Sequence, residues 1–194
     1  MSPGPLPLSA PQERGDAARN RVLLLDAARR LIAQRGAESV SMDDVAAAAG
    51  VGKGTLFRRF GTRAGLMLVL LDEDEKALQQ AFLFGPPPLG PGAPPLERLL
   101  AFGRERLSFA HTHRALLTEA HRELQARYGP VFAVNHTHVR TLLAAAGSTG
   151  DLDVQADALL ALLDPDYVAH RLGQQSLEQV GDAWDSVARK LCGR

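Results

Sequence analysis

Between Gly50 and Thr55 the chain reads GVGKGT, in which a lysine stands between two glycines and a threonine follows. Glycines, a lysine and a hydroxyl at close spacing are the groups with which a backbone loop cradles a phosphate. The phosphate belongs either to the tail of a nucleotide or to the backbone of a nucleic acid. The sequence around the motif separates these two interpretations.

The nucleotide interpretation requires the pattern G-x-x-x-x-G-K-[ST] between a buried strand and a helix. Aligned on Gly52 and Lys53, this chain has Ala47 in place of the first glycine and Gly54 in place of the magnesium-binding hydroxyl. The preceding residues, VAAAA, favour a helix rather than a strand. The motif therefore does not predict a nucleotide site.

The nucleic-acid interpretation fits the two short helices that flank the motif. Ser41 is followed three residues later by Asp44, which resembles a capping box with Asp in place of the usual Glu or Gln. The helix over 42–49 ends at Gly50, and a second helix is expected over 52–60. Two short helices joined by a glycine-containing turn form a helix-turn-helix, whose second helix enters the major groove by its N-terminal residues.

The residues at the start of that second helix suit a DNA groove, because polar side chains alternate with glycines that have none. Lys53 and Thr55 would project from its first turn toward base edges, whereas Gly52 and Gly54 would let the backbone approach the duplex. Lys53 and Arg63 also lie near two helix starts, where acids are normally preferred and where docked phosphates would explain a cation.

The charges support the same partner although the formal net charge is zero. Residues 1–71 carry 10 Lys/Arg and 6 Asp/Glu, whereas residues 72–194 carry 12 and 16. From Val51 to Gly65 there are cations and no acid. The alternative explanation is a solvated basic face without a partner.

Beyond the motif, apolar residues recur at helical spacing and no stretch alternates as a strand would. The sequence therefore predicts an all-α protein. The proline-rich stretch 85–95 is expected to be a connecting loop, because its prolines lack the N–H that a helix needs. Helices are expected over 20–35, 42–49, 52–60, 63–82, 96–111, 114–127, 130–146, 153–172 and 176–191, with a break at Asp164-Pro165.

Three segments around the motif resemble the DNA-binding head of the TetR family of bacterial transcriptional regulators. They are RVLLLDAARRLIAQRG (21–36), SMDDVAAAAGV (41–51) and GTLFRRFGTR (54–63), and their order, spacing and residue types agree across three helices. The resemblance covers residues 21 to about 71. Beyond it only the number and length of the helices are similar.

The resemblance implies a role for individual residues. Ser41 matches a position that hydrogen-bonds a DNA phosphate while capping its helix. Phe57 stands where tyrosine is usual, Arg59 where histidine is common and Arg63 where lysine is usual, and Gly52 stands where serine is frequent. The expected DNA contacts are Arg21, Ser41, Gly52, Lys53, Gly54, Thr55, Phe57, Arg58, Arg59 and Arg63.

The resemblance also implies that residues from about 72 onward form a ligand-binding and dimerisation body. An apolar cavity would favour an apolar or aromatic effector. The candidates for lining it, each of which also suits a plain core, are Phe102, Phe109, Leu116, Leu117, Phe132, Val139, Leu142 and Leu143.

An apolar stripe near the C-terminus independently predicts a contact between subunits. Its residues recur at steps of three or four, which places them on one face of a helix. We expect the stripe to face a second subunit, together with the 153–172 helix, in a four-helix bundle; the alternative is packing within its own chain. The stripe comprises Leu177, Val180, Trp184, Val187 and Leu191.

The remaining residue types exclude several classes of function. The single cysteine, Cys192, excludes a disulfide framework within the chain. No catalytic signature is present, and the acidic run 72–75 is expected to be a solvated helix face. No apolar run has the length of a membrane helix. Neither a metal nor a cofactor is expected, because the close histidine pairs are two residues apart and point away from each other on a helix; the histidines are His111, His113, His121, His136, His138 and His170.

The sequence therefore predicts a cytoplasmic, homodimeric regulator without enzymatic activity. We expect a disordered tail over 1–18, a helix-turn-helix DNA-binding domain over 19–65 and a ligand-binding and dimerisation domain over 66–194. Its expected partners are a palindromic double-stranded DNA operator, which a repressor would occupy, and a small-molecule effector. The alternative is a helical small-molecule binding protein without specific DNA binding.

Overall fold

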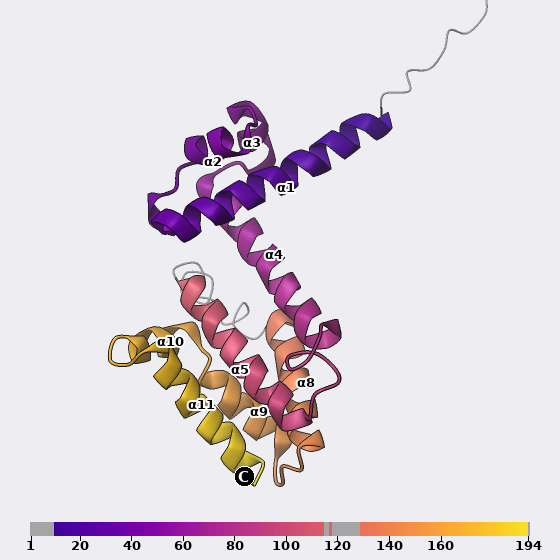
Figure 1. The fold of residues 1–194 in the computed structure, drawn as a ribbon, viewed down its shortest axis with the longest axis vertical. Coiled ribbons are helices and arrows are strands. Elements are labelled where there is room, and N and C mark those ends of the chain that lie inside the picture. The colour runs from indigo at the N-terminus through magenta and orange to yellow at the C-terminus, as the bar shows by residue number, and fades with distance from the viewer. Residues whose placement is uncertain (1–9, 115–116, 118–128, 194) are drawn as a thin grey trace, which may run out of the picture. The chain divides into compact units, whose positions relative to one another are not determined.

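The computed structural model describes residues 10–114, 117 and 129–193, and every regular element in these ranges is a helix (Figure 1). The predicted all-α fold is confirmed for this part of the chain. The chain divides into two compact units, residues 1–72 and 73–194. Among the described residues, no helix combines the length and the apolar character that a membrane span requires.

The N-terminal unit places three helices around one apolar core. Residues buried completely include Leu24 and Ala28 of the first helix, Val45 of the second and Leu56 of the third. Helices this short depend on such packing for their stability. The unit consists of α1 (Ala10–Arg35), the 3-10 turn η1 (Ala37–Ser39), α2 (Met42–Ala49), α3 (Lys53–Phe60) and the first part of α4 (Arg63–Phe84).

The limits of this unit differ from those expected. A tail was expected over 1–18, but α1 begins at Ala10, so residues 10–18 are helical; residues 1–9 lie outside the described ranges. The division between the units falls between Asp72 and Glu73, inside α4, rather than after residue 65. The first turns of α4 stay with the N-terminal unit because Leu66, Met67 and Leu70 belong to its core.

The C-terminal unit is organised around one central helix. α5 packs against α8, α10 and α11, and α8 also packs against α9. The proline-rich stretch before α5 contains no helix, as expected, whereas the predicted helix over 114–127 lies almost entirely outside the described residues. The elements are α5 (Pro95–Thr112), α8 (Pro130–Ala145), α9 (Leu152–Ala161), α10 (Pro165–Leu172) and α11 (Leu177–Leu191).

The predicted break at Asp164-Pro165 separates α9 from α10. Asp164 caps α10, because its Oδ1 accepts hydrogen bonds from the backbone N–H of Asp166 at 3.0 Å and of Tyr167 at 3.3 Å. Pro165 is the first residue of α10, where the missing N–H has no intrahelical partner to lose.

The buried side chain of Trp184 packs α11 against the central helix α5. Its side chain is 2% exposed, and its indole Nε1 donates a hydrogen bond to the carbonyl of Leu159 at 3.1 Å. The ring lies against Gly103 of α5, where an added Cβ would stand 2.2 Å from a ring carbon. Only glycine leaves room for the indole at this crossing. Next to it, Arg104 of α5 bridges to Asp182 at 2.6 Å and to Asp185 at 2.8 Å.

The acidic run 72–75 is only partly a solvated face. Glu75 is 8% exposed; its Oε2 accepts a hydrogen bond from Arg106 Nη1 at 2.6 Å, and its Oε1 accepts one from Gln79 at 3.0 Å. The expectation of a solvated side chain is therefore wrong for Glu75. The carboxylate of Glu75 can lie inside because the half-buried Arg106 supplies a paired cation, whereas Asp72 stays exposed.

His138 is buried among aromatic rings in the middle of the C-terminal unit. Its ring centroid lies 4.4 Å from that of Phe82 and 5.2 Å from that of Phe102, and its Nε2 has no hydrogen-bond partner among the described residues. Burial, with a smaller effect of the nearby Arg98, lowers the pKa of His138 to about 4. The imidazole is therefore neutral in the folded protein.

This histidine is expected to make the protein less stable in acid. The unfolded chain takes up a proton near pH 6.5, whereas the folded ring stays neutral down to about pH 4. The free energy of unfolding therefore does not depend on this group above pH 6.5. It falls by about 2 kcal/mol as the pH decreases toward 4, because only the unfolded chain takes up the proton. Urea unfolding at pH 7.5 and 4.5 measures the loss. His138→Phe, which keeps an aromatic ring in place, should remove this part of the pH dependence; an unchanged dependence would contradict the assignment.

Candidate functional site

The turn between α2 and α3 has the geometry that its glycines require. Gly50 ends α2 in a left-handed conformation (φ 64°, ψ 27°), which side chains rarely tolerate. Gly52 is extended and caps α3, with its carbonyl accepting the N–H of Thr55 at 2.9 Å. α3 buries Leu56 and Phe60 and exposes its opposite face. The predicted helix-turn-helix is thus present in the structure.

The expected capping box at the start of α2 is also present. The hydroxyl of Ser41 accepts the N–H of Asp44 at 3.1 Å, and the Asp44 carboxylate accepts the N–H of Ser41 at 3.1 Å. The Ser41 hydroxyl also donates to Asp44 Oδ2 at 2.7 Å. Hydrogen bonds from the Ser41 hydroxyl, and then from its backbone, lower the pKa of Asp44. Aspartate therefore serves at this position in place of glutamate.

Most of the side chains expected at the DNA lie on the outer face of α3. Lys53, Gly54, Arg58 and Arg59 are exposed, and Thr55 is half-buried. Phe57 is 46% exposed, so much of its phenyl ring lies on the surface of the unit. Arg21 of α1 is half-buried, and Ser41 is exposed at the start of α2.

Lys53 is engaged with an acid of the preceding helix. Its Nζ lies 2.6 Å from Oδ2 of Asp43 in α2, and the two side chains are 64% and 59% exposed. Asp43 was not among the predicted site residues. Its position in the first turn of α2, across the turn from Lys53, is the signal that could have found it. The pair places a negative charge beside the cation that was expected to reach the groove.

Arg59 and Arg63 hold other parts of the unit in place. Arg59 Nη1 donates to the carbonyl of Ala17 in α1 at 2.9 Å. Arg63 Nε donates to the carbonyl of Val40 at 2.9 Å, and its Nη2 donates to the carbonyl of Ala37. Arg63 therefore braces the turn that leads into Ser41. Carbonyls carry no net charge, so both guanidinium groups remain positive.

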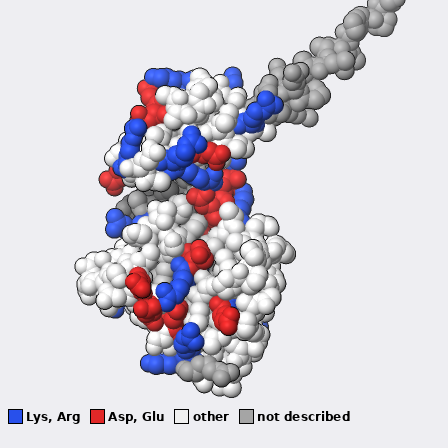
Figure 2. Space-filling model, viewed as in Figure 1, with Lys and Arg blue, Asp and Glu red and all other residues white. Residues whose placement is uncertain are grey.

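The charges on the visible face of the N-terminal unit are mixed. Figure 2 shows Lys and Arg side chains with Asp and Glu side chains between them, rather than one uninterrupted basic surface. The acid-free run from Val51 to Gly65 is local to α3 and the start of α4. In space, Asp43 is brought beside Lys53 of that run.

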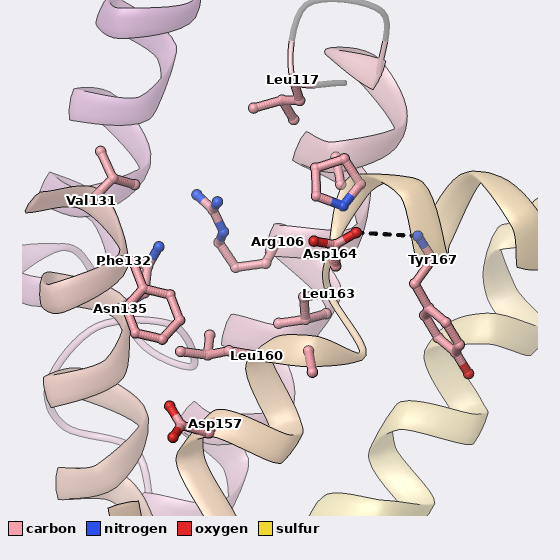
Figure 3. A pocket seen from close by; sticks show the side chains of 13 residues that line it. Arg106, Leu117, Val131, Phe132, Asn135, Asp157, Leu160, Leu163, Asp164 and Tyr167 are labelled. Carbon is pink, nitrogen blue, oxygen red and sulfur yellow. Dashed lines mark hydrogen bonds between the residues drawn. The ribbon is translucent and has the colours of Figure 1, made fainter. Parts of the chain in front are cut away.

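The C-terminal unit contains a cavity of about 480 Å³, a size that accommodates small molecules (Figure 3). Its described walls come from α5, α8, α9 and α10. They include the predicted Leu117 and Phe132, and several polar groups that the sequence did not single out: Arg106, Asn135, Asp157 and Asp164. The sequence prediction considered apolar side chains alone and so missed these.

The other predicted cavity residues lie elsewhere. Phe102, Val139, Leu142 and Leu143 are buried in the core and do not line this cavity. Phe109 is also buried and borders a separate hollow beside α4. Leu116 lies outside the described residues. Helical periodicity marks an inward-facing residue, but it does not distinguish a filled core from the wall of a cavity.

The stripe predicted for a dimer interface is divided between the inside and the outside of α11. Val180 is 5% exposed and Trp184 2% exposed, and both pack within their own chain, so the expectation of subunit contacts is wrong for these two. The wide apolar face of α11 is needed against α5 and α9. Leu177 and Leu191 are half-buried, and Val187 is 37% exposed.

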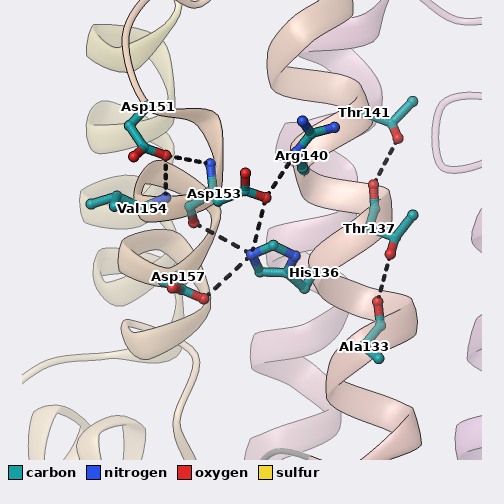
Figure 4. A network of polar contacts seen from close by, with 9 residues as sticks. All are labelled: Ala133, His136, Thr137, Arg140, Thr141, Asp151, Asp153, Val154 and Asp157. Carbon is teal, nitrogen blue, oxygen red and sulfur yellow. Dashed lines mark hydrogen bonds and ion pairs between the residues drawn. The ribbon is translucent and has the colours of Figure 1, made fainter.

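The histidines take part in local contacts. His136 Nε2 lies 3.4 Å from Asp157 Oδ1 and 3.4 Å from the carbonyl of Asp153, while Arg140 Nε lies 2.8 Å from Asp153 Oδ1 (Figure 4). These contacts join α8 to α9. Within the described ranges, no group of three His, Cys, Asp or Glu side chains is arranged to hold a metal ion.

Comparison with known proteins finds a family match for the N-terminal unit. Residues 24–70 match the model of bacterial regulatory proteins, tetR family. No curated protein matches the chain. A TetR-family regulator from Pectobacterium atrosepticum has the same fold, with a TM-score of 0.67 and 21% identity over 92% of this chain and 96% of its own.

Two further solved structures are similar over both units. A transcriptional regulator from Saccharomonospora viridis, in complex with choline, gives a TM-score of 0.66 at 21% identity over 87% of this chain and 95% of its own. A TetR-like regulator from Rhodococcus sp. RHA1 gives 0.57 at 25% identity over 90% and 97%. The helix-turn-helix thus lies in the segment that matches the model of bacterial regulatory proteins, tetR family, and the chain as a whole has the fold of TetR-family transcriptional regulators.

Proposed function

We propose that this protein is a ligand-responsive repressor that binds a palindromic operator as a homodimer. The observation that carries the proposal is the outer face of α3, where Lys53, Thr55 and Arg58 follow an extended Gly52 at the start of a helix-turn-helix. A helix presented in this way fits the major groove, and two copies read half-sites one or more helical turns apart. Because its proposed partner is DNA, the protein is proposed to act in the cytoplasm.

The expected DNA contacts divide into two groups. Lys53, Gly54 and Thr55 begin α3 and are proposed to face base edges. Ser41, Phe57 and Arg58 are proposed to meet the backbone, together with Arg21, Arg59, Arg63 and the backbone at Gly52. Phosphate contacts set affinity for all sequences, and base contacts set the choice among them.

The cavity in the C-terminal unit is proposed to be the effector site. A small molecule bound there would favour one of two states of the dimer that differ in their affinity for DNA. A small-molecule effector is supported by the transcriptional regulator from Saccharomonospora viridis, which has a similar fold and was solved in complex with choline. Leu177, Val187 and Leu191 of α11 remain available to a second subunit.

A footprint on the DNA upstream of the protein's own gene tests the proposal. Protection of a palindromic site, with binding that weakens as salt rises, is expected. Four cations per subunit in the run Val51–Gly65 limit the log–log salt slope of a dimer to about −7. Absence of any protected site, or binding that salt does not affect, contradicts it. Sedimentation of the free protein tests the dimer.

The second candidate, a small-molecule binding protein without specific DNA binding, is favoured by one observation. The Lys53–Asp43 pair neutralises the first cation of α3, and Phe57 offers no hydroxyl to a phosphate. A protein of this kind would bind ligands in the cavity but would protect no site in the footprint.

Removal of the Asp43 charge is expected to strengthen DNA binding. In Asp43→Asn, Lys53 loses its anionic partner and one negative charge beside the proposed phosphate contacts is removed, so affinity should rise about threefold to tenfold at low salt. The salt slope should also steepen, because one more cation per subunit becomes available. Fluorescence anisotropy with the operator duplex measures both. Lys53→Ala should instead change the discrimination between operator and mutated half-sites, and an unchanged affinity in Asp43→Asn would show that the pair is open on DNA.

A further inference from the structure

The ion pair between Lys53 and Asp43 lies at the start of α3, the helix proposed to enter the major groove. Lys53 Nζ lies 2.6 Å from Asp43 Oδ2, and the two side chains are 64% and 59% exposed. The partners are ten residues apart and come from different helices, α3 and α2. An exposed pair of this kind contributes little to stability, so the fold itself gives little reason for it.

The residues beside the pair leave it accessible to a partner. Gly52 and Gly54 flank Lys53, and a Cβ added to either glycine would meet no atom within 4 Å. The neighbouring acid, Asp44, closes the capping box with Ser41. Asp43 takes no part in that cap and contacts Lys53 across the turn instead. Its carboxylate therefore accompanies the lysine wherever the start of α3 docks.

A carboxylate at a DNA surface is repelled by the phosphates and needs a donor on a base edge. In the major groove, aspartate accepts from the N4 amino group of cytosine, whereas lysine donates to O6 and N7 of guanine. These groups belong to the two bases of one G·C pair. Guanine O6 and cytosine N4 are about 2.9 Å apart in that pair, close to the 2.6 Å between the two protein atoms. The ion pair thus matches the edge of a G·C pair, donor to acceptor and acceptor to donor.

An A·T pair offers a poorer match to the same two groups. Its major-groove edge carries one donor between two separated acceptors, followed by the thymine methyl group. An ammonium group held beside a carboxylate would meet a single acceptor there, in place of the adjacent O6 and N7 of guanine. The chemistry of the pair therefore favours G·C.

We propose that Lys53 and Asp43 together recognise one G·C base pair in each operator half-site: Lys53 donates to guanine O6 and N7, and Asp43 accepts from cytosine N4. This inference rests on the proposed function and specifies one feature of the operator. It makes Asp43 a specificity-determining residue. The negative charge of Asp43 weakens binding to every duplex, and its contact with cytosine favours the duplexes that carry G·C at this position.

Selection of sites from random DNA duplexes by the full chain tests the proposal. The selected half-site is expected to contain one G·C position at which Lys53→Ala and Asp43→Ala each reduce the preference from about tenfold to about threefold or less. A preference is a ratio between duplexes, so the general effect of removing a carboxylate cancels. Glu38→Ala, which removes another exposed acid of the same unit, is the matched control and should keep the preference. Loss of preference at different positions in the two variants, or no loss in Asp43→Ala, overturns the proposal.

Modified bases at that position distinguish direct contact from a merely structural effect of Asp43 on Lys53. In N4-methylcytosine, a methyl group replaces the amino hydrogen that faces the groove. Fluorescence anisotropy should show that this base weakens binding of the unaltered protein about tenfold and binding of Asp43→Ala about twofold or less. Inosine in place of guanine keeps the major-groove edge and should leave the affinity of both within about twofold. Equal losses with N4-methylcytosine would show that Asp43 only positions Lys53, and would overturn the proposal.

The selection also separates this inference from the proposed function. A palindromic site whose base preferences do not depend on Asp43 contradicts the G·C contact and leaves the regulator standing. Failure to select any site contradicts the proposed function, and the G·C contact with it.

Discussion

Replacement of Gly103 by alanine is expected to destabilise the protein by about 2–3 kcal/mol, because the new methyl group overlaps a buried indole. The added Cβ would lie 2.2, 2.3 and 2.5 Å from three ring carbons of Trp184. The ring cannot withdraw easily, since its Nε1 is hydrogen-bonded to the carbonyl of Leu159. Thermal unfolding should show a midpoint lower by about 4–10 °C for a chain of this length.

Gly181→Ala is the matched control on the facing helix. Both glycines are helical and buried, but a Cβ at Gly181 first meets the end of the Arg104 side chain, at 3.1 Å. That guanidinium can shift slightly while it keeps its contacts with Asp182 and Asp185. Because alanine is also the better helix former, the change should be neutral or stabilising, by up to about 1 kcal/mol. Equal losses in the two variants would show that steric overlap with Trp184 is not the cause.

Loss of Arg63 is expected to weaken DNA binding by about tenfold to a hundredfold, with little change in preference among sequences. Besides its proposed contact with a phosphate, Arg63 donates to the carbonyls of Val40 and Ala37 and so fixes the turn that presents Ser41. Arg63→Ala leaves both carbonyls without this donor. Arg63→Lys should restore only part of the affinity, because an ammonium group lacks the planar fork that reaches both oxygens.

The salt dependence separates bracing from direct contact. If Arg63 acts through the turn, affinity falls in Arg63→Ala while the log–log salt slope changes little. Arg58→Ala is the control: Arg58 is exposed and its side chain makes no hydrogen bond or ion pair with the described residues, and its loss should flatten the slope by about 1 per phosphate contact. A flattening of that size in Arg63→Ala would instead establish direct binding of phosphate.

The N-terminal unit could be predicted closely because its determinants are local in sequence. The cap at Ser41, the left-handed turn at Gly50 and the periodicity of α1 each act over a few residues. The ion pair between Lys53 and Asp43 could not be predicted from local sequence, because it depends on how α2 crosses α3. An acid-free run in the sequence is therefore not an acid-free surface.

The C-terminal unit was harder to predict because its residues depend on contacts between distant helices. Trp184 has the spacing of an interface residue, but Gly103 of α5 provides the space in which its ring is buried. The neighbouring pair Arg104 and Asp185 joins the same two helices, and neither contact can be read from local sequence. Likewise, no sequence signature places Asn135 and Asp164 at a cavity. Their position on its wall follows only from how α8 and α10 meet α5 and α9.

The hydrogen bonds of Arg59 and Arg63 to backbone carbonyls have a consequence for the entropy of DNA recognition. Long basic side chains normally lose rotational freedom when they meet a duplex, at about 0.5–1.5 kcal/mol for each. Here the two guanidinium groups are already held in single orientations by the carbonyls of Ala17 and Val40. Folding has therefore frozen these rotamers in advance, and each group keeps further N–H donors for a phosphate. The proposed recognition surface would therefore lose little further rotamer entropy at these two side chains on binding an operator.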